Sequence, residues 1–318
     1  MAESIVVGVD VGATKILVGA VTSDGHIVAS RRYPIEHASQ AATLESIYSS
    51  LADFMQDLGG SPARAIGIGL VGQIDPRTGA WLEAMNLPIK SPVLLADEIR
   101  HRHNIPVSLD NDVHAATLAE LRWGIGTESK DFIYLNVGTG VSAGLVFGGQ
   151  LLRGARNFAG ELGHMVVQPD SMPCPCGRRG CLEPIVSGGG ILARVQTELA
   201  NHPDSSLRSL AEPLTAQQVF LAADAGDALA GKITDDAIQA LATALTNLVN
   251  LLNPEWIVYG GGVLSDGWLI DHVRNHVNKQ PLPMIRKSLK GILPSRLDPE
   301  YVGLLGAACL ALDLGERD

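Results

Sequence analysis

The chain has 318 residues, 46% of them hydrophobic and 18% charged, which is the composition of a folded protein and not of a disordered one. A formal net charge of −10 and an aromatic content of 4% argue against binding to nucleic acid, through either its phosphates or its bases. No stretch reaches the roughly 18 apolar residues of a membrane span, and the first residues lack the basic segment of a signal peptide. We therefore expect a cytoplasmic protein that binds neither nucleic acid nor membranes.

Strand and helix patterns alternate along the first half of the chain. Residues 5–10 and 16–21 are apolar runs separated by a glycine turn, which predicts a β-hairpin. The spacing of apolar residues and the turn signals predict five more segments: helix 43–58, strand 66–71, helix 96–103, strand 107–109 and helix 113–123. This order is typical of an α/β protein.

The second half begins with a similar pattern. Strand 132–137, the turn at 138–140 and strand 142–147 repeat the first hairpin, with Asn136 where the first has Asp10. We interpret this as an internal duplication, although glycine hairpins are common enough to coincide by chance. It predicts two similar α/β lobes, each with its own glycine hairpin, at residues 1–120 and 121–302.

Four further features of the chain can be predicted from its sequence. Thr234 is predicted to cap a long helix that Asn253 and Pro254 end. Residues 256–259 form a predicted strand that runs into three glycines, and residues 306–314 a buried helix in which Cys309 is a core thiol. The Gly-x-Gly-x-x-Gly run at 67–72 does not open a helix, so we interpret it as a site of close packing and not as a dinucleotide fingerprint.

The two glycine hairpins are candidate phosphate loops. In residues 10–15, glycine allows backbone N–H groups to approach a phosphate, and Asp10 can hold a hydrated Mg²⁺. Alone, this hairpin would be an ordinary turn. The matching turn at residues 138–140 favours two loops that grip one triphosphate.

Residues 110–112, Asp-Asn-Asp, stand where a strand passes into a helix. One interpretation is helix capping, which Asn and Asp do well. The other is a general base at the carboxyl end of a strand, where α/β sheets bind ligands. The residues themselves favour neither.

A cluster of metal-ligating residues follows. His164, Cys174, Cys176 and Cys181 form a Cys₃His set suited to tetrahedral Zn²⁺. Four protein ligands leave no open position, so the zinc should be structural; the alternative is a loop with free, reactive thiols. Glu161 and Glu183 lie next to ligands in the sequence, so the metal would fix two carboxylates that suit sugar hydroxyls.

The chain resembles the ROK family (repressors, open reading frames and sugar kinases) in five blocks that match in order. They are residues 10–15, 111–112, 138–144, 161–183 and 260–262. The resemblance implies an α/β, actin-like fold of two ribonuclease-H-like lobes with a small structural zinc loop at 164–183. It also implies that a C-terminal helix at about 303–318 joins the N-terminal lobe. It implies ATP-dependent phosphorylation of a hydroxyl of a hexose or similar sugar, with Mg²⁺ and structural Zn²⁺, and a homodimer or higher homo-oligomer.

The resemblance also assigns roles residue by residue. Asp112 matches the catalytic base. Matching the sugar contacts are Asn86, Asn111, Asp112, Glu161, His164 and Glu183. Matching the phosphate and nucleotide loops are Asp10, Gly12, Thr14, Lys15, Gly138, Thr139, Gly140, Gly260, Gly261 and Gly262. The zinc ligands are His164, Cys174, Cys176 and Cys181.

The identity of the sugar stays open. Ile89 and Lys90 follow Asn86-Leu87-Pro88 where glucokinase-like members have Gly-Trp. Glucose, N-acetylmannosamine, allose, fructose, a glycoside or a cyclitol are all candidate acceptors, and polyphosphate is an alternative donor. A sugar-binding regulator without catalysis is the alternative function, but we expect no DNA-binding segment ahead of a phosphate loop that begins at Asp10. A zinc-ribbon interaction module would explain only the cysteine block.

Overall fold

The computed structural model describes residues 5–58, 63–210 and 213–315, which form two compact units. Unit 1 comprises Met1–Lys130, Gly144–Ala159 and Arg296–Asp318, and unit 2 comprises Asp131–Ala143 and Gly160–Ser295. The boundary expected at residue 120 falls inside a helix, and the expected C-terminal helix is present up to Gly315, with residues 316–318 outside the described part.

The first sheet has five strands in the order β3-β2-β1-β4-β7. The strands are β1 (Ile5–Val11), β2 (Lys15–Thr22), β3 (Ile27–Pro34), β4 (Ile66–Leu70) and β7 (Val107–Asn111), with a separate hairpin of β5 (Gln73–Asp75) and β6 (Ala80–Glu83). β1 and β2 form the predicted antiparallel hairpin, whereas β4 and β7 join in parallel. The carboxyl ends of β1, β4 and β7 therefore lie at one edge of the sheet.

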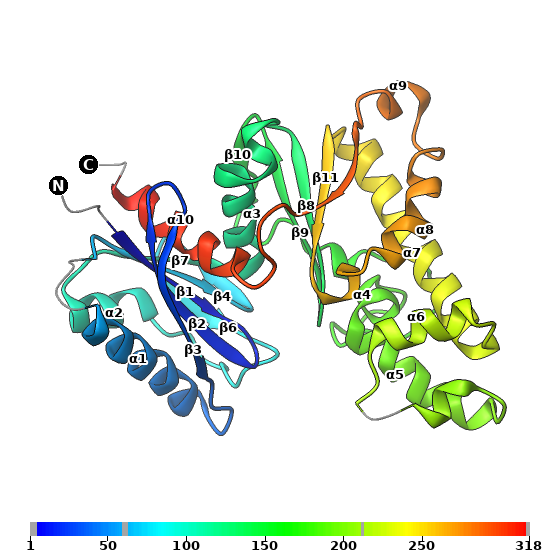
Figure 1. Ribbon diagram of the computed structural model, residues 1–318, viewed down its shortest axis with the longest axis horizontal. Helices are drawn as coiled ribbons and strands as arrows, with labels where there is room; N and C mark the ends of the chain where they lie inside the picture. Colours follow the sequence, from blue (N-terminus) through cyan, green and yellow to red (C-terminus); the bar gives the residue numbers. More distant parts are fainter. Residues whose placement is uncertain (1–4, 59–62, 211–212, 316–318) are drawn as a thin grey trace. The chain divides into compact units, whose positions relative to one another are not determined.

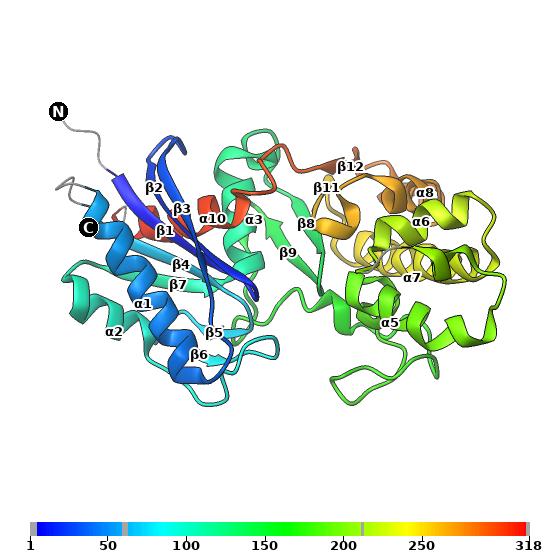
Figure 2. The same ribbon diagram turned by 60° about the horizontal axis from the view of Figure 1, so that its bottom comes forward.

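Helices cover both faces of this sheet (Figures 1 and 2). They are α1 (Gln40–Asp57), α2 (Leu95–His103), α3 (Asp112–Trp123) and α10 (Val302–Gly315), with a 3₁₀ turn η1 (Ile125–Thr127). Because side chains alternate along a strand, Val7 and Val9 of β1 pack with α1 and α2, while Val6 packs with α10. The sheet thus has a core on each side.

Glycines allow α10 to approach the sheet closely. A Cβ atom at Gly67 would clash with the backbone of Ala307, and one at Gly8 would lie 2.6 Å from the carbonyl oxygen of Leu304. Gly72, with φ of 98°, has no room for a side chain beside Glu83. The predicted packing role of the glycines at 67–72 is confirmed.

The second sheet has the same plan, in the order β10-β9-β8-β11-β12. Its strands are β8 (Phe132–Val137), β9 (Val141–Phe147), β10 (Gln150–Leu151), β11 (Trp256–Gly260) and β12 (Gly291–Pro294). In both sheets the first strand stands centrally, with the second and third strands on one side and the later strands on the other. This correspondence supports the predicted duplication.

The helices of unit 2 lie mostly after the zinc block of the sequence. They are α4 (Glu183–Val186), α5 (Gly188–Glu198), α6 (Ala216–Asp224), α7 (Ala228–Leu252), α8 (Trp268–Val277) and α9 (Pro283–Arg286), with 3₁₀ turns η2 (Leu162–His164), η3 (Leu199–Asn201), η4 (Ser206–Ser209) and η5 (Gly262–Leu264). α7 is the long helix expected from the apolar spacing.

The start of α7 differs from the prediction. Asp227, not Thr234, is the N-cap, since its carboxylate accepts hydrogen bonds from Leu229 N at 3.0 Å and Ala230 N at 2.9 Å. Thr234 lies inside the helix, and its hydroxyl donates to the carbonyl of Gly231. A threonine can bond backward within a helix as well as cap one, so its presence alone did not fix the boundary. Asn253 ends the helix as predicted, in the left-handed conformation.

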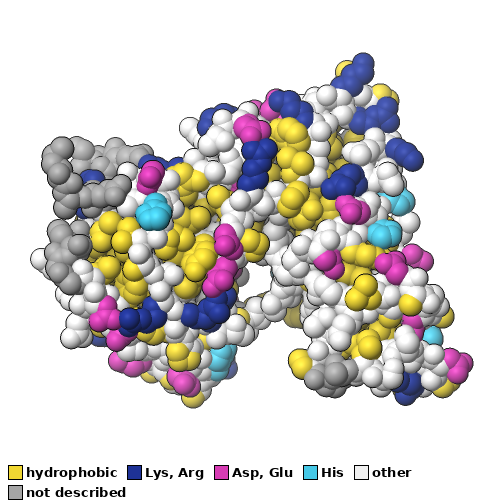
Figure 3. Space-filling model, in the orientation of Figure 1, with side chains coloured by type: hydrophobic (Ala, Val, Ile, Leu, Met, Phe, Trp, Pro, Cys, Tyr) yellow, Lys and Arg dark blue, Asp and Glu magenta, His cyan; other side chains and the backbone are white. Residues whose placement is uncertain are grey.

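Two observations bear on the partners that the composition argues against, nucleic acid and membranes. On the face drawn in Figure 3, basic and acidic side chains are interspersed and form no broad basic field. Within the described residues, no helix is both long and apolar enough to cross a bilayer.

Candidate active site

The predicted residues of unit 1 gather at the carboxyl edge of the first sheet. Asp10 on β1 is in register with Gly69 on β4, which in turn is in register with Asp110 on β7. Asp112 follows directly as the first residue of α3, and its Cα would lie 3.7 Å from a Cβ atom at Gly69. The small residue on the middle strand lets α3 start close to the sheet, so Asp10 and Asp112 become neighbours.

Both carboxyl groups have raised pKa values, and the charge of Asp10 contributes to the shift of Asp112. Burial and the negative charge of Asp10 raise the pKa of Asp112 to about 7. Burial also raises the pKa of Asp10 to about 6, partly offset by the positive charge of Lys15. A pair of acids held together in a partly desolvated place is typical of sites that bind a cation or transfer a proton.

Helix capping, one of the two interpretations of residues 110–112, is carried out by Asn111. Its side-chain oxygen accepts hydrogen bonds from Val113 N at 2.9 Å and His114 N at 3.2 Å, so Asn111 caps α3. Its amide nitrogen donates to the carbonyl of Gly72 at 3.2 Å. Asn111 is therefore the N-cap of α3, while hydrogen bonds from the backbone N–H groups of Val113 and Asp112 to the carboxylate of Asp112 partly offset the rise in the pKa of Asp112.

The first hairpin turn is tight. The N–H of Gly12 donates to the carbonyl of Lys15 at 3.0 Å, and Thr14 is exposed at the tip. Sequence reasoning missed Gly303 in α10, where a Cβ atom would lie 2.5 Å from a carboxylate oxygen of Asp10. No local signal identifies Gly303, because its contact depends on the packing of a helix from the other end of the chain.

Asn86 lies on an exposed loop after β6. The N–H of Ala84 donates to the carbonyl of Ile89 at 3.1 Å, which closes the loop. The loop lines a cavity of about 490 Å³ together with His37, Glu83 and Lys90. The departure from the glucokinase pattern, Ile89-Lys90, therefore lies at this cavity, where Ile89 is buried and Lys90 is exposed.

In unit 2, two glycine segments lie beside each other. The N–H of Gly138 donates to the carbonyl of Gly140 at 2.9 Å, and a Cβ atom at Gly138 would lie 3.9 Å from the nitrogen of Gly262. Gly261 adopts φ of 94°, and a side chain there would clash with the backbone of Val137. The structure thus brings together the turn at 138–140 and the glycines at 260–262, as a pair of backbones without side chains.

Glu183 links the glycine turn to the cysteine block. Its Oε2 accepts a hydrogen bond from Val141 N at 3.0 Å, and a Cβ atom at Gly140 would lie 2.9 Å from the same oxygen. One carboxylate oxygen is therefore engaged with backbone next to the turn. Glu161, whose side chain is 56% exposed, has its Oε2 4.0 Å from Nε2 of His164.

The structure also brings together the four predicted metal ligands. The donor atoms of His164, Cys174, Cys176 and Cys181 all lie within 4.8 Å of one another. Nδ1 of His164 faces the sulfur of Cys174 at 3.7 Å, while Nε2 faces Glu161. The donor set and its spacing fit a tetrahedral zinc ion, with Nδ1 of His164 on the side of the metal and Nε2 on the side of the Glu161 carboxylate.

Glycines make the turns of this cluster possible. Gly177 and Gly180 have φ of 87° and 77°, and Gly180 has no room for a side chain beside the carbonyl of Gln168. The N–H of Gly177 donates to the carbonyl of Cys174 at 2.9 Å. These left-handed residues allow the backbone to turn around the sulfurs.

Comparisons with known proteins agree with this picture. The model of the ROK family matches residues 6–314. The chain is 37% identical over 297 residues to a glucokinase of Halalkalibacterium halodurans, covering 90% of this chain and 88% of that protein. A crystal structure of a ROK family glucokinase from Streptomyces griseus, in complex with glucose and AMPPNP, has a TM-score of 0.81 at 27% identity and covers 98% of this chain and 100% of that one. A ROK family transcriptional regulator, a homolog of the E. coli MLC protein, has a TM-score of 0.86 at 25% identity, covering 97% and 78%. The expected actin-like α/β fold is confirmed.

Proposed function

We propose that this chain, which belongs to the ROK family, is an ATP-dependent sugar kinase of the glucokinase type with Asp112 as its general base. The observation that carries the assignment is the placement of Asp112 beside Asp10, where its pKa rises to about 7. A base with a pKa near the working pH is ionised often enough to accept a proton and basic enough to bind it.

The reaction follows from this chemistry. Asp112 takes the proton of a sugar hydroxyl as that oxygen attacks the γ-phosphorus of ATP, and the bond from that phosphorus to the β,γ-bridging oxygen breaks to release ADP. Phosphoryl transfer depends on positioning and charge stabilisation more than on covalent chemistry. Asp10, together with Thr14 and Lys15 of its hairpin, would hold a hydrated Mg²⁺ and the phosphates, and the cation would offset the charge of the phosphates.

Unit 2 would supply the remaining contacts. Backbone N–H groups of Gly138, Thr139 and Gly140 would bind phosphate oxygens, and the glycines at 260–262 would bind the nucleotide. Glu161 and Glu183 would accept hydrogen bonds from sugar hydroxyls, and His164 would donate one through Nε2 to a hydroxyl oxygen. In unit 1, Asn86 would also contact the sugar, and Asn111 would donate through its amide nitrogen, because its oxygen is already engaged with α3. The zinc would have no part in the chemistry and would hold His164 and the two flanking glutamates in place.

The cavity at Asn86 is the place where we expect the sugar to be selected. It holds Glu83, Lys90 and His37, which offer both hydrogen-bond donors and acceptors. Glucose, N-acetylmannosamine, allose, fructose and cyclitols are the acceptors to compare, with polyphosphate beside ATP as donor. We further propose a cytoplasmic homodimer, on the resemblance alone.

The test is a coupled assay of ADP release with Mg·ATP and a panel of these sugars. Asp112→Asn should lower kcat by about 10²–10⁴-fold while leaving the KM for the sugar nearly unchanged. Asp271→Asn, at an exposed acid on α8, is the control and should keep wild-type turnover. Near wild-type kcat in Asp112→Asn would refute the role of Asp112.

A sugar-binding regulator is the second candidate, favoured by the likeness of the fold to the ROK transcriptional regulator. It predicts thermal stabilisation by one sugar without ADP release in any assay. Sugar-dependent turnover that is lost in Asp112→Asn would exclude it.

A further inference from the structure

We propose that Arg153, with Asn157, is a positioning residue that holds the segment carrying Asp112, an inference that rests on the proposed kinase function. Asp110, two residues before Asp112, is fully buried, with an exposed fraction of 0%. Its side chain therefore has no surface to offer a substrate. What it contacts is the segment that follows β10, more than forty residues further along the chain.

Three groups surround the carboxylate of Asp110. Asn157 Nδ2 donates to Oδ1 at 2.7 Å, the backbone N–H of Asn111 donates to the same oxygen at 2.8 Å, and Arg153 forms an ion pair with Oδ2. Arg153 also donates to the side-chain oxygen of Asn157 at 3.1 Å, which closes a triangle of three side chains. In addition, Nδ1 of His114 lies 3.4 Å from Oδ1, and this contact is the largest of those that lower the pKa of Asp110.

The triangle depends on an unusual backbone conformation. Asn157 adopts φ of 67°, the left-handed region that Asn tolerates better than most residues. In this conformation its amide nitrogen also reaches the carbonyl of Ile74 at 3.3 Å. The segment that carries Arg153 is thus hydrogen-bonded to unit 1 at two places, Asp110 and Ile74. These buried hydrogen bonds offset the strain of the left-handed conformation at Asn157.

The buried acid is charged and needs its cation. Burial alone would raise the pKa of Asp110, but the hydrogen bond of His114 and the positive charge of Arg153 lower it below its ordinary value. An ionised carboxylate that loses its partner in a buried place is strongly unfavourable, so the chain would rearrange around it. Removing Arg153 would therefore disturb residues 110–112 more than a surface substitution would.

These contacts would affect catalysis by fixing the position of residues 110–112. Asp110 fixes the chain before Asp112 through Asn111 N, and the side chain of Asn111 fixes the chain after it by capping α3. Asp112 lies between these two attachments. A displacement of about 1 Å of a catalytic group can cost about 10²-fold in rate, so the buried triangle would act on kcat without touching substrate.

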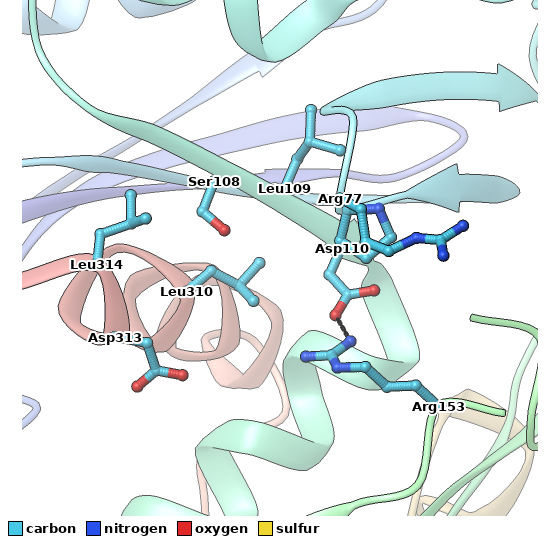
Figure 4. Close-up of a pocket in the computed structure, with 9 residues that line it drawn as sticks. Arg77, Ser108, Leu109, Asp110, Arg153, Leu310, Asp313 and Leu314 are labelled. Atoms are coloured by element: carbon cyan, nitrogen blue, oxygen red, sulfur yellow. Dashed lines mark hydrogen bonds and ion pairs between the residues drawn. The ribbon is translucent and has the colours of Figure 1, made fainter. Parts of the chain in front are cut away.

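A cavity gives access to this ion pair. It has a volume of about 230 Å³ and is lined by both partners together with Arg77, Ser108, Leu310 and Asp313. Figure 4 shows the guanidinium of Arg153 meeting the carboxylate of Asp110 at the wall of this cavity. The side chain of Arg153 is 36% exposed, so its removal would leave a space that a free guanidinium ion can enter from solvent.

The experiment compares Arg153→Ala with Arg156→Ala, an exposed arginine on the same segment. With the best sugar of the panel, Arg153→Ala should lower kcat by about 10–100-fold per folded molecule and change the KM for the sugar little. Guanidinium chloride far below denaturing concentration should restore much of kcat in Arg153→Ala only, whereas equal ammonium chloride should not. Unchanged kcat, or loss without rescue by guanidinium, would overturn the proposal.

Two further variants keep the test decisive if Arg153→Ala folds poorly. Arg153→Lys keeps the charge, but its shorter side chain does not place an N–H donor where Nη1 of Arg153 contacts both Asp110 and Asn157, so kcat should fall severalfold. Asn157→Asp keeps the size and the left-handed tolerance but places a second carboxylate against Asp110, and should lower kcat at least as far. Wild-type kcat in both soluble variants would contradict a positioning role.

Amide hydrogen exchange separates this proposal from the proposed function. In Arg153→Ala, or in Arg153→Lys if the former is insoluble, the N–H groups of Val113 and His114 should exchange faster than in Arg156→Ala. Unchanged exchange there would overturn the positioning role even in an active enzyme. A wild type without sugar-dependent turnover would refute the kinase assignment, while the exchange result would still decide whether Arg153 holds this segment.

Discussion

The two hairpins β1–β2 and β8–β9 occupy the same place in their sheets and carry different chemistry. Asp10 on β1 is in register with Gly69 on the adjacent parallel strand, and Asn136 on β8 is in register with Gly260. The backbone plan is thus the same at both positions, but a carboxylate stands in one and an amide in the other. An acid suits a cation or a proton, whereas an uncharged glycine turn suits an anion. Two copies of one fold can therefore meet two needs of phosphoryl transfer separately. The first hairpin would hold a cation or a proton, and the second would bind phosphate.

The units also differ in how the chain beside the hairpin is held. In unit 1, α10 packs on glycines of the sheet and contacts Asp10 through Gly303. In unit 2, the segment beside the turn contains the four metal ligands, and Glu183 connects it to Val141. Helix packing supports one hairpin, and a His-Cys₃ cluster lies beside the other. The following experiments separate the contributions of these two supports.

The largest effect is expected from the metal cluster. Cys176→Ser should reduce zinc to well under one ion per chain, lower the thermal midpoint by several degrees and raise the KM for the sugar, because Glu161 and Glu183 lose their support. Hydrogen exchange should increase at residues 164–183 and stay unchanged in the first sheet. Cys309→Ala, in α10, is the control and should retain a full zinc complement by metal analysis. Full zinc in Cys176→Ser would contradict the site.

The second prediction concerns Asp10 and Asn136, the acid and the amide at matching positions of the two hairpins. Asp10→Asn should lower kcat by about 10²-fold or more, since the carboxylate that would hold Mg²⁺ is lost. Asn136→Asp introduces a negative charge beside the second turn and should raise the KM for ATP about tenfold or more by repelling phosphate. Steady-state kinetics with varied Mg·ATP would measure both. Equal, small effects of the two substitutions would mean that the hairpins do not differ in role.

The pH dependence should show the interaction between the two acids of unit 1. Asp112 must be ionised to act as a base, so kcat/KM should rise with pH through about 7, the pKa that burial and Asp10 give it. In Asp10→Asn the neighbouring negative charge is gone, and this acid limb should move to lower pH. His114, whose charge lowers the pKa of Asp112, is kept in both proteins. An identical profile for the residual activity of Asp10→Asn would show that the two carboxyl groups are not coupled.

The smallest effects compare one helical glycine in each unit. Gly303→Ala would place a Cβ atom 2.5 Å from the Asp10 carboxylate and should lower kcat about tenfold with only a slight loss of stability. Gly231→Ala, inside α7, meets no atom within 4 Å and should raise the free energy of unfolding by about 0.5–1 kcal/mol without changing activity. Kinetics and denaturant unfolding of both variants would measure this contrast. Loss of activity in Gly231→Ala, or none in Gly303→Ala, would contradict it.

Much of the fold could be predicted from local patterns. The apolar runs and turn glycines predicted both hairpins, and the spacing at 43–58 and 113–123 predicted α1 and α3 within a few residues. The His-Cys₃ spacing predicted a cluster that the structure brings within 4.8 Å. The start of α7 was wrong because capping depends on which of several polar side chains reaches the free N–H groups.

The sequence by itself indicated the two glycine hairpins, several of the helices and strands around them, and the His-Cys₃ set, because each depends on neighbours within a few positions. Only the tertiary structure decided that Asp10 and Asp112 are neighbours and that Gly303 contacts Asp10. The pairing of Arg153 with Asp110 belongs to the same class, since it joins a segment after β10 to the end of β7. Such contacts depend on the packing of strands and helices distant in the chain, and the pKa of a partly buried acid depends on those contacts in turn.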